Sequence, residues 1–440
     1  MPYIPHTKKE TDEMLKIIGI SKIEDLFSAV PESILQKDFY NLPEGLSEQE
    51  VKTKITRLAK KNKISKSSFL GGGYYNHYIP APVARLVFRS EFYTAYTPYQ
   101  PEISQGILQS IFEYQTMIVR LTAMDVTNAS MYDGSTASAE TCIMAVNITK
   151  RKKVLVAKSI HPEYRQVMKT YCNAKELEFV EIPFSAKSGE LNQMKLLEML
   201  DENVAGVFVQ SPNFFGIVEN MKKISEIAHN NQSLSIQIIA EALSLGLLIP
   251  PGENDVDIAV GDGQSFGMPI SSGGPSFGFL ATKEKYLRQL PGRIVGETID
   301  TEGKKAYVLT LQAREQHIRR EKASSNICSN QALCALTGLI YLATLGKNLQ
   351  KLAKLNHTNA LYFQKQLAQK RFARTFSSSF FNEFVIDAGN SDLIKKLREK
   401  NISAGLDLGK IYPEMQGKIL VTVTEMNDKE EMEEYLKILD

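Results

Sequence analysis

The chain has 440 residues, so we expect two or three domains rather than one core. Its hydrophobic content of 43% and charged content of 23% are typical of a globular protein. Because 52 basic residues stand against 50 acidic ones, the net charge of +2 gives no indication of a nucleic-acid partner. No stretch predicts a membrane span, and the polar N-terminus does not resemble a signal peptide, so we expect a cytoplasmic protein.

The cysteines and histidines indicate no metal site. The four cysteines are scattered, and the spacing of Cys328 and Cys334 fits neither a zinc pair nor a redox motif. The six histidines form no HxxxH or HExxH pattern. We therefore expect reduced, buried thiols and no structural metal.

The N-terminal segment predicts a helical arm. Three capping boxes begin at Thr7, Ser21 and Ser47, each with a glutamate three residues later. Apolar residues at helical spacing follow the first and third boxes. The glycines at 71–73 end this pattern, and a stretch rich in tyrosine and proline continues to residue 102. We assign residues 1–102 to this arm and the stretch that follows it.

Strand-like and helix-like segments alternate in the middle of the chain. A long helix is predicted at 103–121, and shorter helices at 137–148, 162–173 and 221–230. Apolar runs typical of strands occupy residues 154–157, 177–182, 204–210, 236–240, 258–261 and 277–281. This alternation predicts parallel βαβ units in one large, mostly parallel α/β domain over residues 103–330.

The C-terminal quarter has a different pattern. After Arg293 the sequence becomes typical of helices through Leu345. Strand candidates then occur at 382–386 and 418–424. We expect a small α+β domain over residues 331–440.

The loop-to-helix junction at 132–139 has the residue types of an anion site. Gly134 allows the backbone to approach a ligand closely, and Ser135 and Thr136 add hydroxyl groups at a helix N-terminus. Unpaired amides and the helix dipole favour phosphate there. The same pattern also makes an ordinary helix cap, and these residues alone leave both interpretations open.

Two of the predicted strands end in residues that suit a ligand site. His161 follows the strand at 154–157, and Glu241 follows the strand at 236–240. Ligands collect at the carboxyl edge of an open α/β sheet. A carboxylate there is costly to bury unless it has a cationic partner, such as a protonated pyridine nitrogen. A solvated strand end is the alternative.

This order of elements is the layout of a fold-type I pyridoxal-phosphate (PLP) enzyme, in which a lysine follows the acidic strand. Here that turn carries Gln264, and no lysine occurs between Lys223 and Lys283. Because an amide cannot form a Schiff base, we expect no catalytic residue of this kind in the chain. The predicted vestigial cofactor pocket consists of Gly134, Ser135, Thr136, His161, Glu241 and Gln264.

With these residues located, nearly the whole chain resembles the glycine cleavage system P-protein family, on the side of the alpha (N-terminal-type) subunits of two-chain glycine decarboxylases. The matching segments are YIPHT at 3–7, YNHYIP at 75–80, YTPYQPEISQG at 96–106, FEYQTM at 112–117, VGDGQ at 260–264, GGP at 273–275, PGRIVG at 291–296, LQAREQHIRR at 311–320 and SNIC at 325–328. Their order over the full length carries the resemblance, because no single segment decides it.

The resemblance implies that a matching beta subunit carries the Schiff-base lysine and holds PLP covalently. The pair would decarboxylate glycine and pass the aminomethyl group to the lipoyl arm of the H-protein, as a glycine dehydrogenase (aminomethyl-transferring). The family forms alpha–beta pairs, commonly doubled to a heterotetramer, with the active site near the subunit interface. Glu241 departs from the aspartate of the fold, and with Gln264 it puts PLP binding by this chain in doubt.

Two loops are candidates for completing the partner's site, because polar and aromatic residues are dense in them. The residues expected to face the beta subunit's cofactor are Tyr96, Thr97, Tyr99, Gln100, Ser325 and Asn326. Ordinary packing of tyrosines is the alternative. We interpret His77 and His317 as ordinary surface or core histidines. For Arg293 and Arg314, carboxylate binding, guidance of the acidic H-protein and salt bridges all stay open.

Two other functions stay open as well. A self-sufficient PLP enzyme, such as an aminotransferase or desulfurase, would need a lysine after residues 258–260. A pure scaffold would stabilise its partner and contribute nothing to the chemistry. Point variants that keep assembly intact and abolish turnover would exclude the scaffold.

Overall fold

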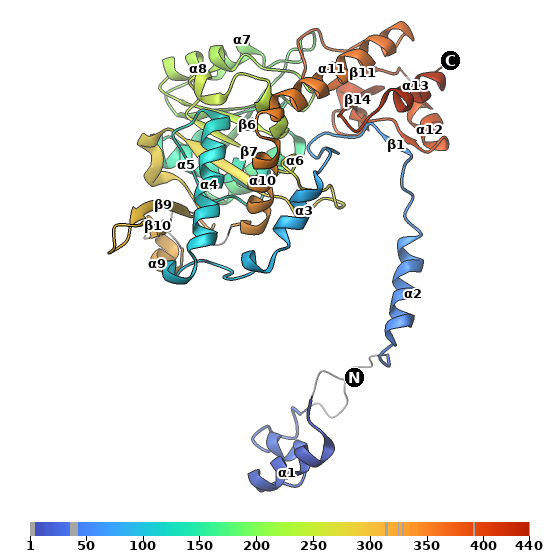
Figure 1. The fold of residues 1–440 in the computed structure, drawn as a ribbon. Helices are drawn as coiled ribbons and strands as arrows, with labels where there is room; N and C mark the ends of the chain where they lie inside the picture. The colour runs from blue at the N-terminus through green and yellow to red at the C-terminus, as the bar shows by residue number, and fades with distance from the viewer. Residues whose placement is uncertain are drawn as a thin grey trace. The chain divides into compact units, whose positions relative to one another are not determined.

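The structure is a computed structural model that describes residues 5–35, 43–312, 316–323, 325–327, 330–389 and 392–439. The chain divides into two compact units, Met1–Ile64 and Ser65–Asp440. The sequence pattern predicts the first boundary after residue 102, whereas the structure places it after Ile64. The Tyr- and Pro-rich stretch therefore belongs to the larger unit. Figure 1 shows the elements of both units.

The first unit consists of short helices, α1 (Lys8–Ile18), the 3-10 turn η1 (Ile23–Phe27) and α2 (Glu48–Ala59). The capping boxes of α1 and α2 are confirmed, with Thr7 paired to Glu10 and Ser47 to Glu50. The predicted box at Ser21 is wrong in its acidic partner. Asp25 accepts the hydrogen bonds from Ser21, because η1 begins one residue later than the pattern indicated.

The larger unit is built on a seven-stranded sheet in the order β2-β8-β7-β6-β5-β3-β4. The five parallel strands are β3 (Lys153–Ala157), β4 (Glu178–Ile182), β5 (Val204–Gln210), β6 (Leu234–Ile239) and β7 (Ile258–Asp262). The antiparallel strands β8 (Gly278–Thr282) and β2 (Val126–Thr127) complete one side. The predicted α/β class with a mostly parallel sheet is confirmed.

Helices cover both faces of this sheet because successive strand residues point to opposite sides. Ile258 and Val260 of β7 pack in the apolar cluster that contains α5 (Gly134–Thr149) and α6 (Pro162–Ala174). Ala259, between them, packs in the cluster that contains α4 (Gln105–Thr122) and α10 (Ala332–Leu345) (Figure 1). The remaining helices of this region are α3 (Ala81–Val87), α7 (Gln193–Met199) and α8 (Met221–Asn230), with the 3-10 turns η2 (Ser90–Phe92), η3 (Pro101–Ile103), η4 (Ala242–Gly246), η5 (Pro251–Asn254) and η6 (Glu284–Gln289).

The C-terminal part follows the long helix α11 (Asn348–Gln369) and forms its own apolar cluster. Its three-stranded sheet has the order β11-β14-β13, with β11 (Glu383–Asp387), β13 (Leu406–Asp407) and β14 (Lys418–Thr422). The short strand β1 (Ser67–Ser68) pairs in parallel with β12 (Ile402–Ser403), so the chain enters the larger unit beside its own C-terminal part. The other elements here are α12 (Asp392–Glu399), α13 (Lys429–Lys437), η9 (Leu408–Lys410) and η10 (Pro413–Met415).

The region after Arg293 is not helical throughout, so that prediction is wrong over residues 294–310. Strands β9 (Ile294–Ile299) and β10 (Lys305–Thr310) form an antiparallel hairpin there, followed by α9 (Gln316–Arg319) and η8 (Arg320–Lys322). The β-branched residues of IVGETI favour the strand, and Gly303 occupies a left-handed position in the turn. After the short elements α9 and η8, the next long helix is α10.

Among the described residues, no single helix is long and apolar enough to cross a membrane. The pair α10 and α11 meets the length and composition test only together and is bent by 91°.

Candidate functional site

Three of the predicted site residues lie where parallel strands end. His161 follows β3, Glu241 follows β6, and Gln264 follows β7. A short segment of the chain, residues 71–78, runs across all three and contacts each of them. These contacts decide what the pocket can hold.

Both polar atoms of the Gln264 side chain bond to this segment. The N–H of Tyr75 donates to Gln264 Oε1 at 2.8 Å, and Gln264 Nε2 donates to the carbonyl oxygen of Tyr75 at 3.0 Å. The same Nε2 also donates to the carbonyl oxygen of Met268 at 2.7 Å. The side chain at the predicted lysine position is therefore a buried backbone clamp, with each polar atom paired.

Glu241 has a cationic partner within the chain. His77 Nε2 lies 3.0 Å from Glu241 Oε2, and His77 Nδ1 lies 2.9 Å from Glu425 Oε2. The exposed fractions of the three side chains are 3%, 2% and 8%. Burial alone would lower the pKa of His77, but Glu241 and Glu425 outweigh it and raise that pKa to about 10. The carboxylate after β6 thus faces an imidazolium.

The segment's glycines hold the ring of His161 in place. The N–H of Glu163 donates to His161 Nδ1, so Nε2 is the protonated nitrogen and donates to the carbonyl oxygen of Gly72 at 2.6 Å. Burial lowers the pKa of His161. A Cβ atom on Gly73 would lie 2.7 Å from His161 Nε2, so the backbone itself covers the ring.

The start of α5 is occupied by carboxylates. The Gly134 N–H donates to Asp262 Oδ2 at 3.0 Å, and the Thr136 N–H donates to Asp133 Oδ1 at 2.7 Å. The Ser135 hydroxyl also donates to Asp133 Oδ1, at 2.6 Å. The amides of Gly134 and Thr136 and the hydroxyl of Ser135 are thus already paired, and two carboxyl groups would repel a phosphate dianion at this helix end.

An open cavity of about 920 Å³ lies outside this arrangement. Ser135, His161 and Gly71–73 line it, whereas Glu241 and Gln264 do not. Arg165 also lines it and is paired with Glu181 and with the hydroxyl of Tyr412. Of the six predicted pocket residues, Ser135 and His161 therefore line this cavity, whereas Glu241 and Gln264 are buried beneath residues 71–78.

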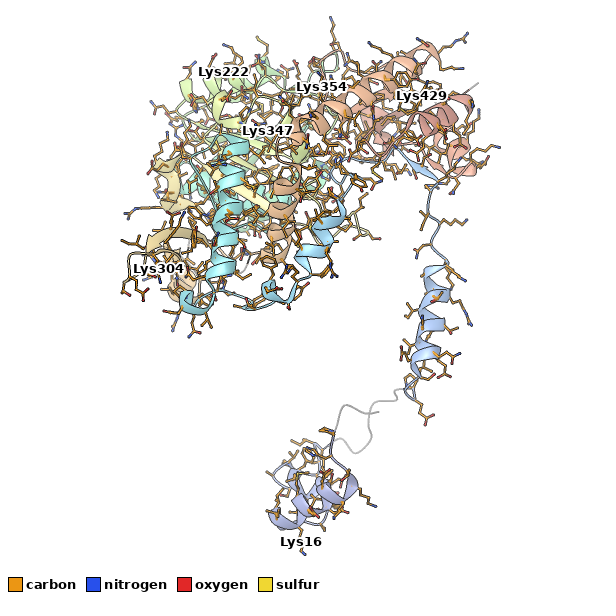
Figure 2. All side chains as sticks on the ribbon, in the orientation of Figure 1. Lys16, Lys222, Lys304, Lys347, Lys354 and Lys429 are labelled. Atoms are coloured by element: carbon orange, nitrogen blue, oxygen red, sulfur yellow. The ribbon has the colours of Figure 1, made fainter. Side chains whose placement is uncertain are left out.

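These residues do not fit PLP. A Schiff base needs a lysine, and position 264 is an amide. The pyridine nitrogen needs a carboxylate, and Glu241 is paired with His77. Figure 2 labels five lysines of the larger unit, which lie on helices, at the start of α11 and in the β9–β10 hairpin. All five are exposed: Lys222, Lys304, Lys347, Lys354 and Lys429.

The sequence profile of the glycine cleavage system P-protein family matches residues 1–439. The chain belongs to this family.

Relatives in the P-protein family match over their full length. A protein of Carboxydothermus hydrogenoformans, named probable glycine dehydrogenase (decarboxylating) subunit 1, is 50% identical over 443 residues, covering 100% of this chain and 99% of the relative. A protein of a Geobacillus species with the same name is 49% identical and covers 99% and 98%. The crystal structure of a P-protein in inhibitor-bound form superposes with a TM-score of 0.91 at 42% identity, covering 100% and 99%.

More distant structures show the fold alone. A NifS-like protein has a TM-score of 0.63 at 12% identity, over 85% of this chain and 98% of its own. Together with the P-protein structure it confirms the predicted fold-type I architecture. The chain therefore has the fold of a PLP enzyme, whereas the residues of its predicted pocket are paired with one another and do not fit PLP.

The aromatic loop proposed to reach a partner lies at the surface. Tyr96 is 85% exposed and lines a cavity of about 400 Å³ with Tyr93 and Asn330. Arg293 Nη2 donates to the Tyr99 hydroxyl at 3.0 Å, and its guanidinium lies 5.3 Å from that ring's centroid. This interaction with buried Arg293 fixes Tyr99 beside the β9 end of the hairpin. Thr97 accepts from the Tyr99 N–H, and Gln100 precedes η3.

Ser325 and Asn326 line a different cavity, of about 440 Å³, with Glu140 and Tyr171. The structure therefore does not bring the two predicted loops into one cavity. Burial raises the pKa of the Glu140 carboxyl group, and the Ser325 side chain partly opposes that rise. Arg314 and the side chain of His317 lie outside the described residues.

Sequence reasoning missed the partners that fill the pocket. His77 was interpreted as an ordinary histidine, and Glu383 and Glu425 were not singled out. These carboxylates come from β11 and from the turn after β14, more than 300 residues beyond the segment they bind. The only local signal was the glycine triplet, which permits a close approach but does not identify its target.

Proposed function

We propose that this chain is the catalytically incomplete subunit of a heteromeric glycine decarboxylase in the glycine cleavage system. A second subunit would hold PLP covalently on its own lysine and supply the electron sink for decarboxylation. The observation that carries this proposal is Gln264, whose amide clamps Tyr75 where a self-sufficient enzyme needs a lysine. The relatives named as subunit 1 of glycine dehydrogenase support the existence of such a partner.

The contribution of this chain would come from its exposed loops. Tyr96 is too exposed for a core residue, and Tyr99 is held in place by Arg293. A partner surface placed over this loop would bury the aromatic side chains, which are typical of interface anchors. We propose that Tyr96, Thr97, Tyr99 and Gln100, and separately Ser325 and Asn326, border the partner's active site.

The acceptor of the aminomethyl group would be the lipoyl arm of the H-protein, whose disulfide is reduced in the reaction. We place the complex in the cytoplasm, as a pair or doubled to a heterotetramer.

A self-sufficient PLP enzyme is disfavoured by the paired state of Glu241 and by the carboxylates at the start of α5.

The test is a reduction experiment with PLP and borohydride. The purified chain, its beta subunit and their mixture are each incubated with PLP, reduced, and mapped by intact mass and peptide analysis. We expect PLP fixed only on the beta subunit, and glycine decarboxylation only in the mixture. An adduct on a lysine of this chain, together with activity of the chain alone, would overturn the proposal.

A further inference from the structure

Residues 71–78 pass through the larger unit in a way that only glycine permits at its start. A Cβ atom on Gly71 would overlap the side chains of Thr422 and Glu383. Gly72 and Gly73 have φ angles of +75° and +130°, in the region that disfavours other residues. The backbone here lies directly against side chains from both parts of the unit.

On one side the segment is bonded to the carboxyl edge of the seven-stranded sheet. His161 donates a hydrogen bond to the carbonyl oxygen of Gly72, and the Gln264 side chain forms hydrogen bonds with both the N–H and the carbonyl oxygen of Tyr75. Glu241 holds the ring of His77. These three side chains follow β3, β7 and β6, so the segment spans the edge where a ligand of this fold would lie.

On the other side the segment is bonded to the C-terminal part. Glu383 accepts from the Gly72 N–H at 2.7 Å and from the Tyr75 hydroxyl at 2.8 Å. The Thr424 hydroxyl donates to the carbonyl oxygen of Asn76 at 2.7 Å, and the Tyr78 N–H donates to Glu425 at 2.7 Å.

His77 joins the two sides through a single ring. One nitrogen contacts Glu241, after β6, and the other contacts Glu425, after β14. Two buried carboxylates sharing one imidazolium are stable only while that cation stays in place, because either would otherwise be buried with an unpaired charge. The ring therefore bonds the sheet and the C-terminal part to each other, in addition to direct bonds such as that from the Phe381 N–H to the carbonyl oxygen of Gly216 and that from the Tyr412 hydroxyl to the carbonyl oxygen of Lys158.

We propose that residues 71–78, which we call the clasp, permanently occupy the vestigial cofactor pocket of this chain. The clasp holds the C-terminal part against the sheet, a task that needs no bound cofactor. His77 provides the positive charge that the strand-end carboxylate requires. The clasp thus both excludes PLP from this subunit and fixes its two parts as one body.

Hydrogen exchange measured by mass spectrometry tests the clasp in the full chain purified with its beta subunit. We expect peptides covering residues 69–80 to exchange as slowly as the central strands. In His77→Gln we expect exchange at least tenfold faster in residues 69–80 and, together with it, in residues 380–389 and 418–427. Tyr75→Phe removes only the bond to Glu383 and serves as a milder variant, with a smaller increase in the same peptides.

The matched control is His229→Gln. His229 also bridges two carboxylates, Asp255 at 3.4 Å and Asp257 at 2.7 Å, but it lies outside the clasp. Its variant should leave residues 69–80 unchanged. The proposal is overturned if the wild-type segment exchanges within seconds. It is also overturned if opening of residues 69–80 leaves the C-terminal peptides protected.

Equilibrium dialysis of PLP against the purified chain, with the beta subunit as positive control, tests the occupancy directly. We expect no PLP retained by the wild-type chain at concentrations that saturate the beta subunit. Non-covalent retention of PLP by this chain, with residues 69–80 still protected, would contradict the clasp as occupant and would leave the incomplete-subunit proposal standing.

Discussion

The side-chain amide of Gln264 pairs with both backbone groups of Tyr75, accepting from its N–H at 2.8 Å and donating to its carbonyl at 3.0 Å. This pairing occupies the position at which the sequence pattern predicts the lysine of a PLP enzyme. We therefore expect that restoring the lysine alone does not restore a cofactor site.

For Gln264→Lys we expect no PLP fixed at position 264 after borohydride reduction. The new side chain would lose the acceptor for the Tyr75 N–H and bury a charge, which destabilises by roughly 3–5 kcal/mol. Glu241 and the carboxylates at α5 would still oppose the cofactor. Intact mass after reduction is the measurement, and the beta subunit in the same mixture is the positive control. A stoichiometric adduct at position 264 would show that the pocket is open.

His77 makes stability depend on pH. Its pKa of about 10 in the folded chain lies above the value of about 6.5 for an unfolded histidine. The stabilisation is therefore fully present below about pH 6.5 and is lost as the pH rises through about 10. We expect His77→Gln to be less stable than the wild type by roughly 3–5 kcal/mol at pH 6. That difference should shrink steadily towards pH 10.

The measurement is the thermal unfolding midpoint of both proteins between pH 6 and pH 10. A wild-type advantage that stays constant across this range would contradict a charged His77. His229→Gln again serves as the control, because its ring is 31% exposed and should contribute little.

Gly216 is needed for contact between the loop after β5 and β11. Its φ is +79°, and a Cβ atom there would overlap the backbone carbonyl of Glu383. We expect Gly216→Ala to destabilise by about 3 kcal/mol or more, since strain and overlap add. Gly303 has the same φ of +79° with nothing near its Cβ position, so Gly303→Ala should lose only about 1 kcal/mol. If the two variants shifted the unfolding midpoint equally, the close contact between Gly216 and Glu383 would not contribute to stability.

Variants of Tyr96 and Asn326 distinguish a role at the subunit interface from ordinary packing within this chain. Both are exposed in this chain, so Tyr96→Phe and Asn326→Ala should leave its unfolding midpoint unchanged. If the loops border the partner's site, glycine turnover by the assembled complex should fall roughly tenfold or more for at least one variant, as for a lost polar contact to reacting groups. Tyr362→Phe on α11 is the control. Unchanged turnover in both variants, with assembly intact, would exclude the interface role.

Much of the fold was predictable because its signals are local. The runs at 154–157, 204–210 and 258–261 became β3, β5 and β7, since buried parallel strands read as continuous apolar segments. The segment at 294–310 was not predictable as a hairpin from helical periodicity. Its strands β9 and β10 are stabilised by pairing with each other, a non-local contact that helix-type periodicity does not reveal.

The sequence by itself determined the family, the mostly parallel sheet, and the absence of a lysine between Lys223 and Lys283. Each of these depends only on the identity and order of the residues. Only the tertiary structure decided what fills the pocket. His77 meets Glu241 and Glu425 across separations of 164 and 348 residues. A buried charged side chain pairs with the oppositely charged group that the fold places within hydrogen-bonding distance. Which group lies within that distance depends on the packing of the whole chain.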